Sequence, residues 1–311
     1  MPPRICRAGR IRRADRIRRA DRIRSAGRTP RSALAIACAI VAAAAALQAA
    51  PAVASPLLYV GLGDSYSAAS GVLPPDITAP PECLRSSLNY PHVIAAKLGA
   101  QLTDVTCGAA TTSNFFHAQY PDVPPQLNAL NVHTQLVTMT IGGNDSNVFI
   151  DAVADCGSAG LSTFGQGSPC KDRYGSSFDD TIRNTTYPSL VNALNAVRAK
   201  APHARIAILG YPWIMPATGG CFPQMPVASG DVPYVRDIQA TLNNAIRHAA
   251  AATGATYVDF STVSNGHDAC QPIGVRWIEP ALGGTNPVVV HPNALGESQM
   301  AAQTLTVLGL G

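Results

Sequence analysis

The sequence is poor in charged and aromatic side chains, with 14% Asp, Glu, Lys and Arg and 6% Phe, Trp and Tyr among 311 residues. The charge is unevenly distributed along the chain. The first 54 residues hold 12 of the 23 Lys and Arg but only 2 of the 19 Asp and Glu. The remainder has 11 basic and 17 acidic residues, a net charge of −6. Nucleic-acid binding needs a concentrated basic patch. The composition therefore excludes a nucleic-acid partner.

Long apolar runs are also absent. The longest covers residues 33–47 and is 15 residues long, short of the roughly 20 that cross a bilayer. It follows a basic stretch at 10–24 that repeats RIRRAD, and it precedes Ala52-Val53-Ala54, whose small alternate residues suit signal peptidase. We expect residues 1–54 to be a basic leader with a secretory signal peptide. A secreted domain at 55–311 without a stable membrane span would remain.

Zinc-type CxxC and HxxxH spacings are missing, as are P-loop and dinucleotide fingerprints, so we expect no metal and no organic cofactor. Cysteine itself is not missing, and an even number remains after the leader. In an oxidising compartment six cysteines would form three disulfides, and of the 15 possible connectivities the sequential one closes the shortest loops. The six are Cys83, Cys107, Cys156, Cys170, Cys221 and Cys270.

Short apolar runs rich in β-forming residues indicate strands at 57–61, 102–106, 136–141, 205–209 and 256–260. Helical spacing lies between or after them, at 90–98, 148–154, 187–200, 235–252 and 294–308. The alternation predicts a single-domain three-layer α/β/α sandwich with a mainly parallel five-stranded sheet. Stretches rich in Gly and Pro at 73–81, 158–169 and 215–231 are expected to be surface loops. Functional groups in such a sheet gather at the carboxyl ends of the strands.

The first predicted strand leads into the block GDSYS at 63–67. A serine at the start of a helix exposes its hydroxyl beside unpaired backbone N–H groups, although the block alone is equally typical of a helix cap. CGAA at 107–110 and IGGND at 141–145 follow the next two strands, and HPN at 291–293 precedes the last helix. A glycine N–H and an asparagine amide could donate to one oxygen, and a histidine could take the serine proton.

Together these four blocks resemble those of the SGNH family of GDSL hydrolases. The resemblance implies a flavodoxin-like fold and carboxylic-ester hydrolysis through an acyl-enzyme on Ser65, with His291 as general base. It also implies an oxyanion hole formed by Gly108, Asn144 and the Ser65 backbone N–H. The six cysteines further resemble those of secreted actinobacterial lipases and esterases, which implies sequential pairing: Cys83 with Cys107, Cys156 with Cys170, and Cys221 with Cys270.

The sequence departs from many family members just before the histidine. Val288 stands three residues before His291, where an aspartate is common. Some secreted relatives orient the imidazole with a backbone carbonyl instead, so the resemblance predicts a Ser-His dyad with the Val288 carbonyl in this role. A carboxylate reaching in from Glu279 or Asp259 is the alternative.

The sequence leaves the substrate class open. We expect a monomeric lipase or esterase acting on a small-molecule or lipid ester; the alternatives are a carbohydrate esterase that removes acetyl groups, or a non-catalytic secreted binding protein on the same scaffold. A lipid substrate would favour an apolar acyl pocket, although core packing would explain its candidate lining equally well. These candidates are Phe115, Phe116, Trp213, Ile214 and Met215.

Overall fold

The computed structural model describes residues 55–311; the predicted leader and signal peptide lie outside the described residues. Five parallel strands form one sheet in the order β2-β1-β3-β4-β5. Their bounds are β1 (Leu58–Gly63), β2 (Gln101–Asp104), β3 (Leu136–Thr140), β4 (Arg205–Leu209) and β5 (Thr256–Val258). β3 is buried along its whole length, as expected for a central parallel strand covered on both faces. Each strand overlaps its predicted run.

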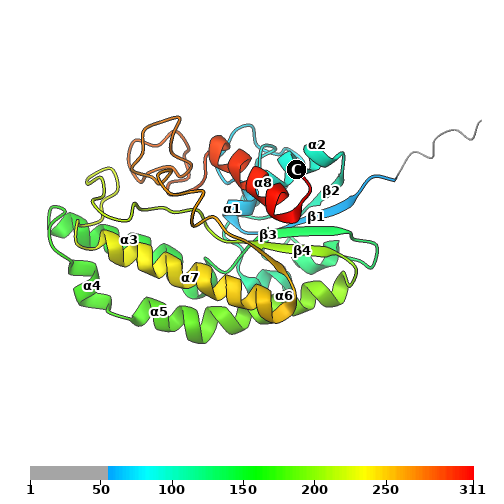
Figure 1. Ribbon diagram of the computed structural model, residues 1–311, viewed down its shortest axis with the longest axis horizontal. Helices are drawn as coiled ribbons and strands as arrows, with labels where there is room; N and C mark the ends of the chain where they lie inside the picture. Colours follow the sequence, from blue (N-terminus) through cyan, green and yellow to red (C-terminus); the bar gives the residue numbers. More distant parts are fainter. Residues whose placement is uncertain (1–54) are drawn as a thin grey trace, which may run out of the picture. The chain divides into compact units, whose positions relative to one another are not determined.

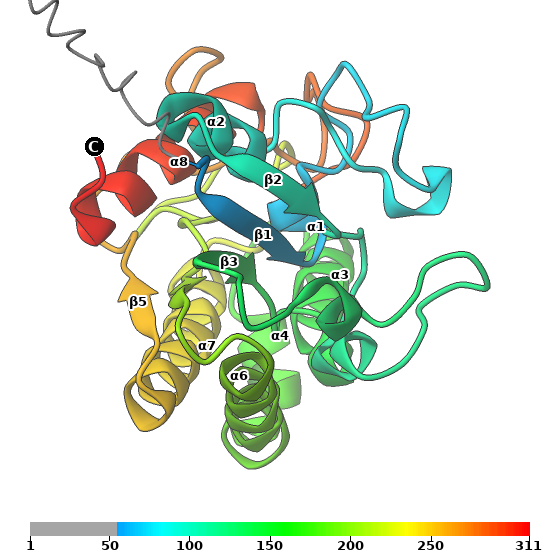
Figure 2. The ribbon, with the colours of Figure 1, turned by 90° about the vertical axis from the view of Figure 1, so that its right-hand side faces the viewer.

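Helices cover both faces of the sheet (Figure 2). Helices α2 (Tyr90–Leu98) and α8 (Ala294–Leu308) pack together on one face, and α6 (Tyr187–Lys200) and α7 (Val232–Thr253) on the other. Asn89 and Asn293 cap α2 and α8 by accepting backbone N–H groups three residues on. The predicted three-layer α/β/α sandwich is therefore confirmed. None of the helices in the described part of the chain is long and apolar enough to cross a membrane.

Shorter elements complete the domain. The one-turn helix α1 (Ser65–Ala68) follows β1 directly, and α4 (Pro169–Tyr174) and α5 (Ser177–Thr181) follow one another along the lower edge of Figure 1. The remaining turns are η1 (Pro81–Cys83), η2 (Thr112–Phe115), η3 (Gln126–Ala129), η4 (Asp145–Asn147) and η5 (Ile182–Thr186).

Helix α3 (Val148–Ser162) is longer than its predicted span of 148–154 and takes in part of the expected loop at 158–169. Gly160 is one of the glycines in the stretch that suggested that loop, but Gly160 and Gly157 both face Pro226. A Cβ atom added at Gly160 would lie only 2.1 Å from the Pro226 carbonyl oxygen. These glycines therefore permit close packing of a helix against a loop, instead of ending the helix.

The three disulfides have the sequential pairing that the resemblance implied: Cys83–Cys107, Cys156–Cys170 and Cys221–Cys270. The first joins η1 to the segment after β2, and the second joins α3 to α4. All six cysteines of the described chain are thus engaged, which leaves none to bind zinc.

Candidate active site

Ser65 lies at the first position of α1, directly beyond the carboxyl end of β1. The preceding Gly63 has φ 124°, and a Cβ atom there would lie 2.4 Å from the carbonyl oxygen of Thr140. Only glycine fits this turn. Asp64 then caps α1, because its carboxylate accepts the backbone N–H of Tyr66 at 3.1 Å. The turn leaves the Ser65 hydroxyl at the surface of a pocket.

His291 contacts Ser65 across 226 positions of sequence. Its Nε2 lies 2.7 Å from the Ser65 Oγ, and its Nδ1 lies 2.7 Å from the carbonyl oxygen of Val289. A ring nitrogen facing a carbonyl carries the hydrogen, so Nδ1–H donates to Val289 and Nε2 keeps a lone pair directed at the serine hydroxyl. This is the tautomer that a general base requires.

The predicted orienting carbonyl at Val288 is wrong, because the structure places that of Val289 on the imidazole. The reason lies in Val290, whose φ is 59°. This left-handed turn folds the carbonyl two residues before His291 back onto the ring. A β-branched residue rarely adopts that conformation, so surrounding contacts must hold it in place.

Tyr66 supplies one such contact, although sequence reasoning did not single it out. Its phenol hydroxyl donates to the carbonyl oxygen of Val290 at 2.8 Å, and its ring centroid lies 5.2 Å from that of His291. The residue next to the nucleophile thus ties α1 to the histidine loop. A tyrosine directly after the serine was the only available signal, and its partner is distant in sequence.

Neither alternative carboxylate orients His291. The Glu279 side chain pairs with Arg276 at 2.6 Å and accepts the side-chain amide of Asn293 at 2.8 Å. These bonds hold the pKa of Glu279 below its ordinary value against the opposing effect of burial. Asp259 accepts the backbone N–H of Ser261 instead. Glu279 supports the loop only indirectly, since its backbone exchanges hydrogen bonds with Val290 and His291.

Gly108, the predicted oxyanion donor, has no free backbone hydrogen to offer. Its N–H donates to the carbonyl oxygen of Cys83 at 2.8 Å, so this hydrogen is already engaged. The next residue, Ala109, is exposed and has φ 60°. Within residues 55–311 the backbone N–H groups of Ala109 and Ser65 have no hydrogen-bond partner. The carbonyl oxygen of Cys83, the disulfide partner of Cys107, therefore accepts the Gly108 N–H, whereas the Ala109 N–H stays available.

Asn144 lies beside Ser65 in the lining of the same pocket. Its side-chain nitrogen donates to the carbonyl oxygen of Ala110 at 3.0 Å. One amide hydrogen is thus used to connect the loops after β2 and β3, and the second remains available. The amide is held by this bond before any substrate arrives, as preorganised stabilisation of a developing negative charge requires.

The left-handed conformation of Ala109 provides a test of this loop. An alanine there costs about 1 kcal/mol relative to glycine, so Ala109→Gly is expected to keep kcat and to raise the free energy of unfolding by up to about 1 kcal/mol. Thermal denaturation and ester hydrolysis measure the two. The matched control is Ala110→Gly, which is fully buried with ordinary φ and should destabilise. A comparable loss in both variants would contradict the assigned backbone.

A buried hydrogen-bonded group supports the nucleophile turn from beneath. Tyr211, just after β4, donates to the Asp64 carboxylate at 2.5 Å and accepts the N–H of Gly143 at 3.0 Å. Thr140 donates to the same carboxylate at 2.7 Å. Burial raises the pKa of Asp64 to about 6, and the bonds from Tyr211 and Thr140 oppose that rise. The loops carrying Ser65 and Asn144 therefore share one anchor, which the sequence did not reveal.

The pKa of His291 predicts a pH dependence. Burial lowers this pKa below the ordinary value of 6.5, and the bond to Val289 opposes the shift. The neutral imidazole is the active base, so kcat/KM should rise with pH through a midpoint below 6.5 and be level at pH 7. The Asp64 carboxyl, with a pKa of about 6, titrates in the same range, so the profile is also measured for Asp64→Asn. A midpoint above 7 in both proteins would contradict the prediction.

An apolar pocket opens beside Ser65 and His291. It has a volume of about 90 Å³. The side chains that give it an apolar wall come from α3, from the segment after β4 and from the histidine loop: Phe149, Ile150, Val153, Tyr211, Val289 and Val290. The candidate lining residues at 115–116 and 213–215 do not line this pocket. Four of those five side chains are buried elsewhere in the fold, as the core-packing alternative expected.

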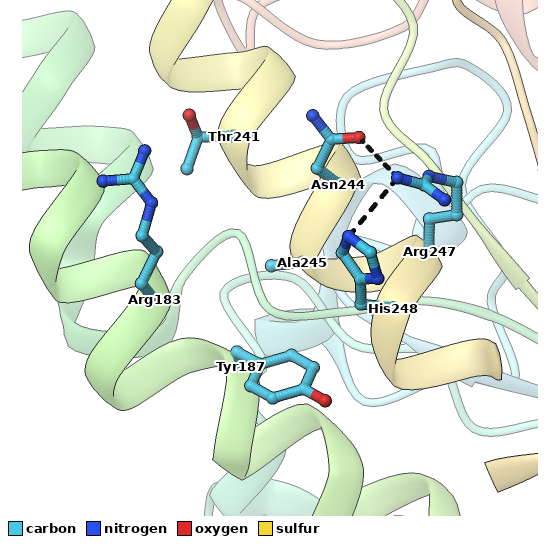
Figure 3. A pocket seen from close by; sticks show the side chains of 7 residues that line it. All are labelled: Arg183, Tyr187, Thr241, Asn244, Ala245, Arg247 and His248. Atoms are coloured by element: carbon cyan, nitrogen blue, oxygen red, sulfur yellow. Dashed lines mark hydrogen bonds between the residues drawn. The ribbon is translucent and has the colours of Figure 1, made fainter. Parts of the chain in front are cut away.

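A second cavity, of about 420 Å³, lies between η5, α6 and α7 (Figure 3). Arg183 at one side is 3.6 Å from Asp179, and Arg247 at the other contacts Asn244 and His248 at 3.3 Å. The lining contains no serine, cysteine or carboxylate. Although this cavity is larger, no hydroxyl in its lining makes a hydrogen bond to an imidazole of the described chain, whereas Ser65 contacts His291. The small pocket at Ser65 is therefore the candidate active site.

Comparison with known proteins supports this choice. The model of the GDSL-like Lipase/Acylhydrolase family matches residues 62–298. Lipase 2 of Streptomyces coelicolor is 64% identical over 263 residues, which are 84% of this chain and 89% of that protein.

Two solved structures share the fold. The phospholipase A1 of Streptomyces albidoflavus has a TM-score of 0.67 and 30% identity, covering 82% of this chain and 99% of that one. The extracellular lipase of Streptomyces rimosus has a TM-score of 0.64 and 28% identity, covering 81% and 97%. With these matches and the geometry at Ser65, the chain belongs to the GDSL-like lipase/acylhydrolase family and is a carboxylic-ester hydrolase.

Proposed function

We propose that Ser65 is the nucleophile and His291 the general base of a Ser-His dyad. The observation that carries this proposal is the 2.7 Å contact between Nε2 and Oγ, with Nδ1 held by a carbonyl. Nε2 accepts the Oγ proton as the oxygen attacks the ester carbonyl. The protonated imidazole then gives that proton to the leaving alcohol, and an acyl-enzyme remains. Water repeats the sequence, releasing the acid and restoring Ser65.

The tetrahedral intermediate carries its charge on the former carbonyl oxygen. We assign its stabilisation to the backbone N–H groups of Ser65 and Ala109 and to the amide of Asn144. The support is that Asn144 lines the pocket with Ser65, and that each of these three residues keeps a hydrogen not engaged within the described chain. Ala109 belongs to the loop whose Ala110 carbonyl accepts the Asn144 amide. A carbonyl at Nδ1 stabilises imidazolium less than a carboxylate would, so this hole must supply much of the electrostatic stabilisation.

We propose lipid esters as the substrate class. The support is the apolar wall formed by Phe149, Ile150, Val153 and Val289, which suits a hydrocarbon chain and offers few hydrogen bonds to a sugar. The relatives called lipase and phospholipase A1 agree with this class. We further propose that residues 1–54 direct secretion, as the name of the extracellular Streptomyces rimosus lipase supports, and we expect a monomer.

Acyl-length profiles test the substrate class. The parent should hydrolyse p-nitrophenyl octanoate at least as well as the acetate, whereas a deacetylase would lose activity beyond short chains. Val153→Trp should fill the pocket, lowering kcat/KM for the octanoate about tenfold or more and leaving the acetate nearly unchanged. Val307→Trp, at an exposed site on α8, is the matched control. Equal losses on both esters, or a collapse of the parent beyond acetate, would contradict a lipid acyl pocket.

A further inference from the structure

Helix α3 exposes large apolar side chains along one face. Ile150 and Leu161 are 60% and 54% exposed. They are 11 residues apart, which places them within about 20° of each other around the helix and about 16 Å apart along it. Ala154 is exposed between them on the same face. Gly157, which also lies on this face, is buried beneath Pro226, and Pro226 is itself partly exposed. The exposed apolar surface therefore runs from Ile150 and Ala154 over Pro226 to Leu161.

The exposed apolar surface continues past the end of α3. Phe164 is 83% exposed. Phe222, which is 38% exposed, packs against the neighbouring backbone, since a Cβ atom at Gly165 would lie 2.7 Å from its ring. We call Ile150, Ala154, Leu161, Phe164 and Phe222 the α3 surface. Isolated exposed hydrophobic residues are ordinary, but a connected set marks an interaction site.

One end of the α3 surface is the mouth of the active site. Ile150 lines the pocket together with its neighbour Phe149 and with Val289, which is itself 48% exposed. A partner resting on this surface would therefore lie against the pocket entrance. This continuity favours a partner that contains the substrate.

The charge around the α3 surface narrows the class of partner. No Lys or Arg occurs in residues 148–169, 215–231 or 279–290, which form this surface and border the pocket. Asp151 and Asp155 lie on the adjacent face of α3, about 100° and 140° from Ile150.

The cations nearest to α3 in sequence are Lys171 and Arg173 on α4, which the Cys156–Cys170 disulfide joins to α3. Together with Asp172 they leave three carboxylates against two cations beside the α3 surface. Anionic lipid therefore gains no net attraction here, because the α3 surface itself has no cation to pair with phosphate. The partner that fits the α3 surface is therefore a lipid surface without net charge.

We propose that the α3 surface docks on the uncharged or zwitterionic surface of aggregated ester lipid, with the pocket mouth turned toward it. The inference rests on the proposed lipid-ester function and adds how that substrate is approached. Helices with one apolar and one polar face bind lipid–water boundaries in this way, burying the apolar side. The docked enzyme would draw single lipid molecules into the pocket directly from the aggregate.

The test measures binding and turnover separately. The Leu161→Ser/Phe164→Ser variant is compared with the Ile77→Ser/Ile273→Ser control, whose side chains are 94% and 70% exposed elsewhere. Sedimentation with ether-linked phosphatidylcholine vesicles, which cannot be hydrolysed, measures binding. Rates on emulsified tributyrin and on dissolved p-nitrophenyl butyrate measure turnover. Phe164→Ser alone, beyond the helix end, guards against damage to α3.

We expect the double variant to bind vesicles and hydrolyse the emulsion at least tenfold less well, with an unchanged rate on the dissolved ester and an unaffected control. Phosphatidylglycerol in the vesicles should weaken binding at low salt. Docking is overturned if the parent does not bind vesicles, or if anionic lipid strengthens its binding. It is also overturned if the double variant and the control lose vesicle binding equally. A change of the double variant from dimer to monomer in size-exclusion chromatography, with vesicle binding unchanged, would likewise contradict it. If the parent binds vesicles but hydrolyses only acetate esters, the proposed lipid-ester function is contradicted while the docking proposal is supported.

Discussion

Replacing Ser65 or His291 with alanine is expected to lower kcat for p-nitrophenyl butyrate by about 10⁴-fold or more. Each change removes one end of the 2.7 Å contact between Oγ and Nε2. Without Oγ no acyl-enzyme forms, and without the imidazole nothing takes the hydroxyl proton. Because the pair acts as a unit, the double variant should be no slower than the slower single variant.

His203→Ala is the matched control for His291→Ala, since His203 is exposed and outside the pocket. Circular dichroism and thermal denaturation establish that each variant is folded. A fluorophosphonate probe should label the parent at Ser65 and fail to label Ser65→Ala. If either single variant is folded and hydrolyses the ester as fast as the parent, the assignment of the Ser65–His291 dyad is wrong.

Replacing Asn144 with alanine is expected to lower kcat by about 10²–10³-fold with little change in KM, the usual effect of losing one oxyanion donor. Its side chain makes no capping bond to η4, so the helical turn beyond it should persist. The bond to the Ala110 carbonyl would be lost, and a modest decrease in the free energy of unfolding should accompany the catalytic loss.

Asn128→Ala is the corresponding control, because Asn128 is exposed in η3 and remote from the pocket lining. The measurement that matters is the division between kcat and KM. A rise in KM at constant kcat would assign Asn144 to substrate binding, contrary to a role in the transition state.

The strand pattern was enough to predict where the site assembles. Parallel strands bring their carboxyl ends to one edge, so blocks after β1 and β3 had to meet there, and the structure brings Ser65 and Asn144 into one pocket. His291 joins them from the segment before α8. These placements follow from topology, which apolar periodicity reveals.

The finer assignments depended on backbone geometry that residue type conceals. Val290 and Ala109 both adopt positive φ, which neither residue favours. The first conformation places the Val289 carbonyl, and not that of Val288, on the imidazole. The second accompanies a Gly108 N–H that is already engaged, which is why we propose Ala109 as the oxyanion donor. Such conformations are imposed by distant contacts, here the hydroxyl of Tyr66 and the carbonyl of Cys83, so no local pattern could predict them.

The pocket lining was missed for a different reason. Ending α3 at 154 left no basis for seeing its exposed face, and bulky residues after β4 looked available for an acyl chain. Trp213 is instead fixed in the fold, where its indole N–H donates to the Ser261 carbonyl at 2.8 Å. Whether an aromatic residue faces a cavity or the core depends on packing across the whole domain.

The disulfide between Cys83 and Cys107 is expected to make the position of the loop at 108–110 depend on the redox state of these cysteines. Cys107 immediately precedes Gly108, and Cys83 supplies the carbonyl that holds the Gly108 N–H. Opening this link frees two segments that together set the direction of the Ala109 N–H. Ester hydrolysis should therefore weaken under reducing conditions before the sheet itself unfolds. We therefore expect a newly synthesised chain with free thiols to be a poorer esterase than the same chain after its cysteines have paired.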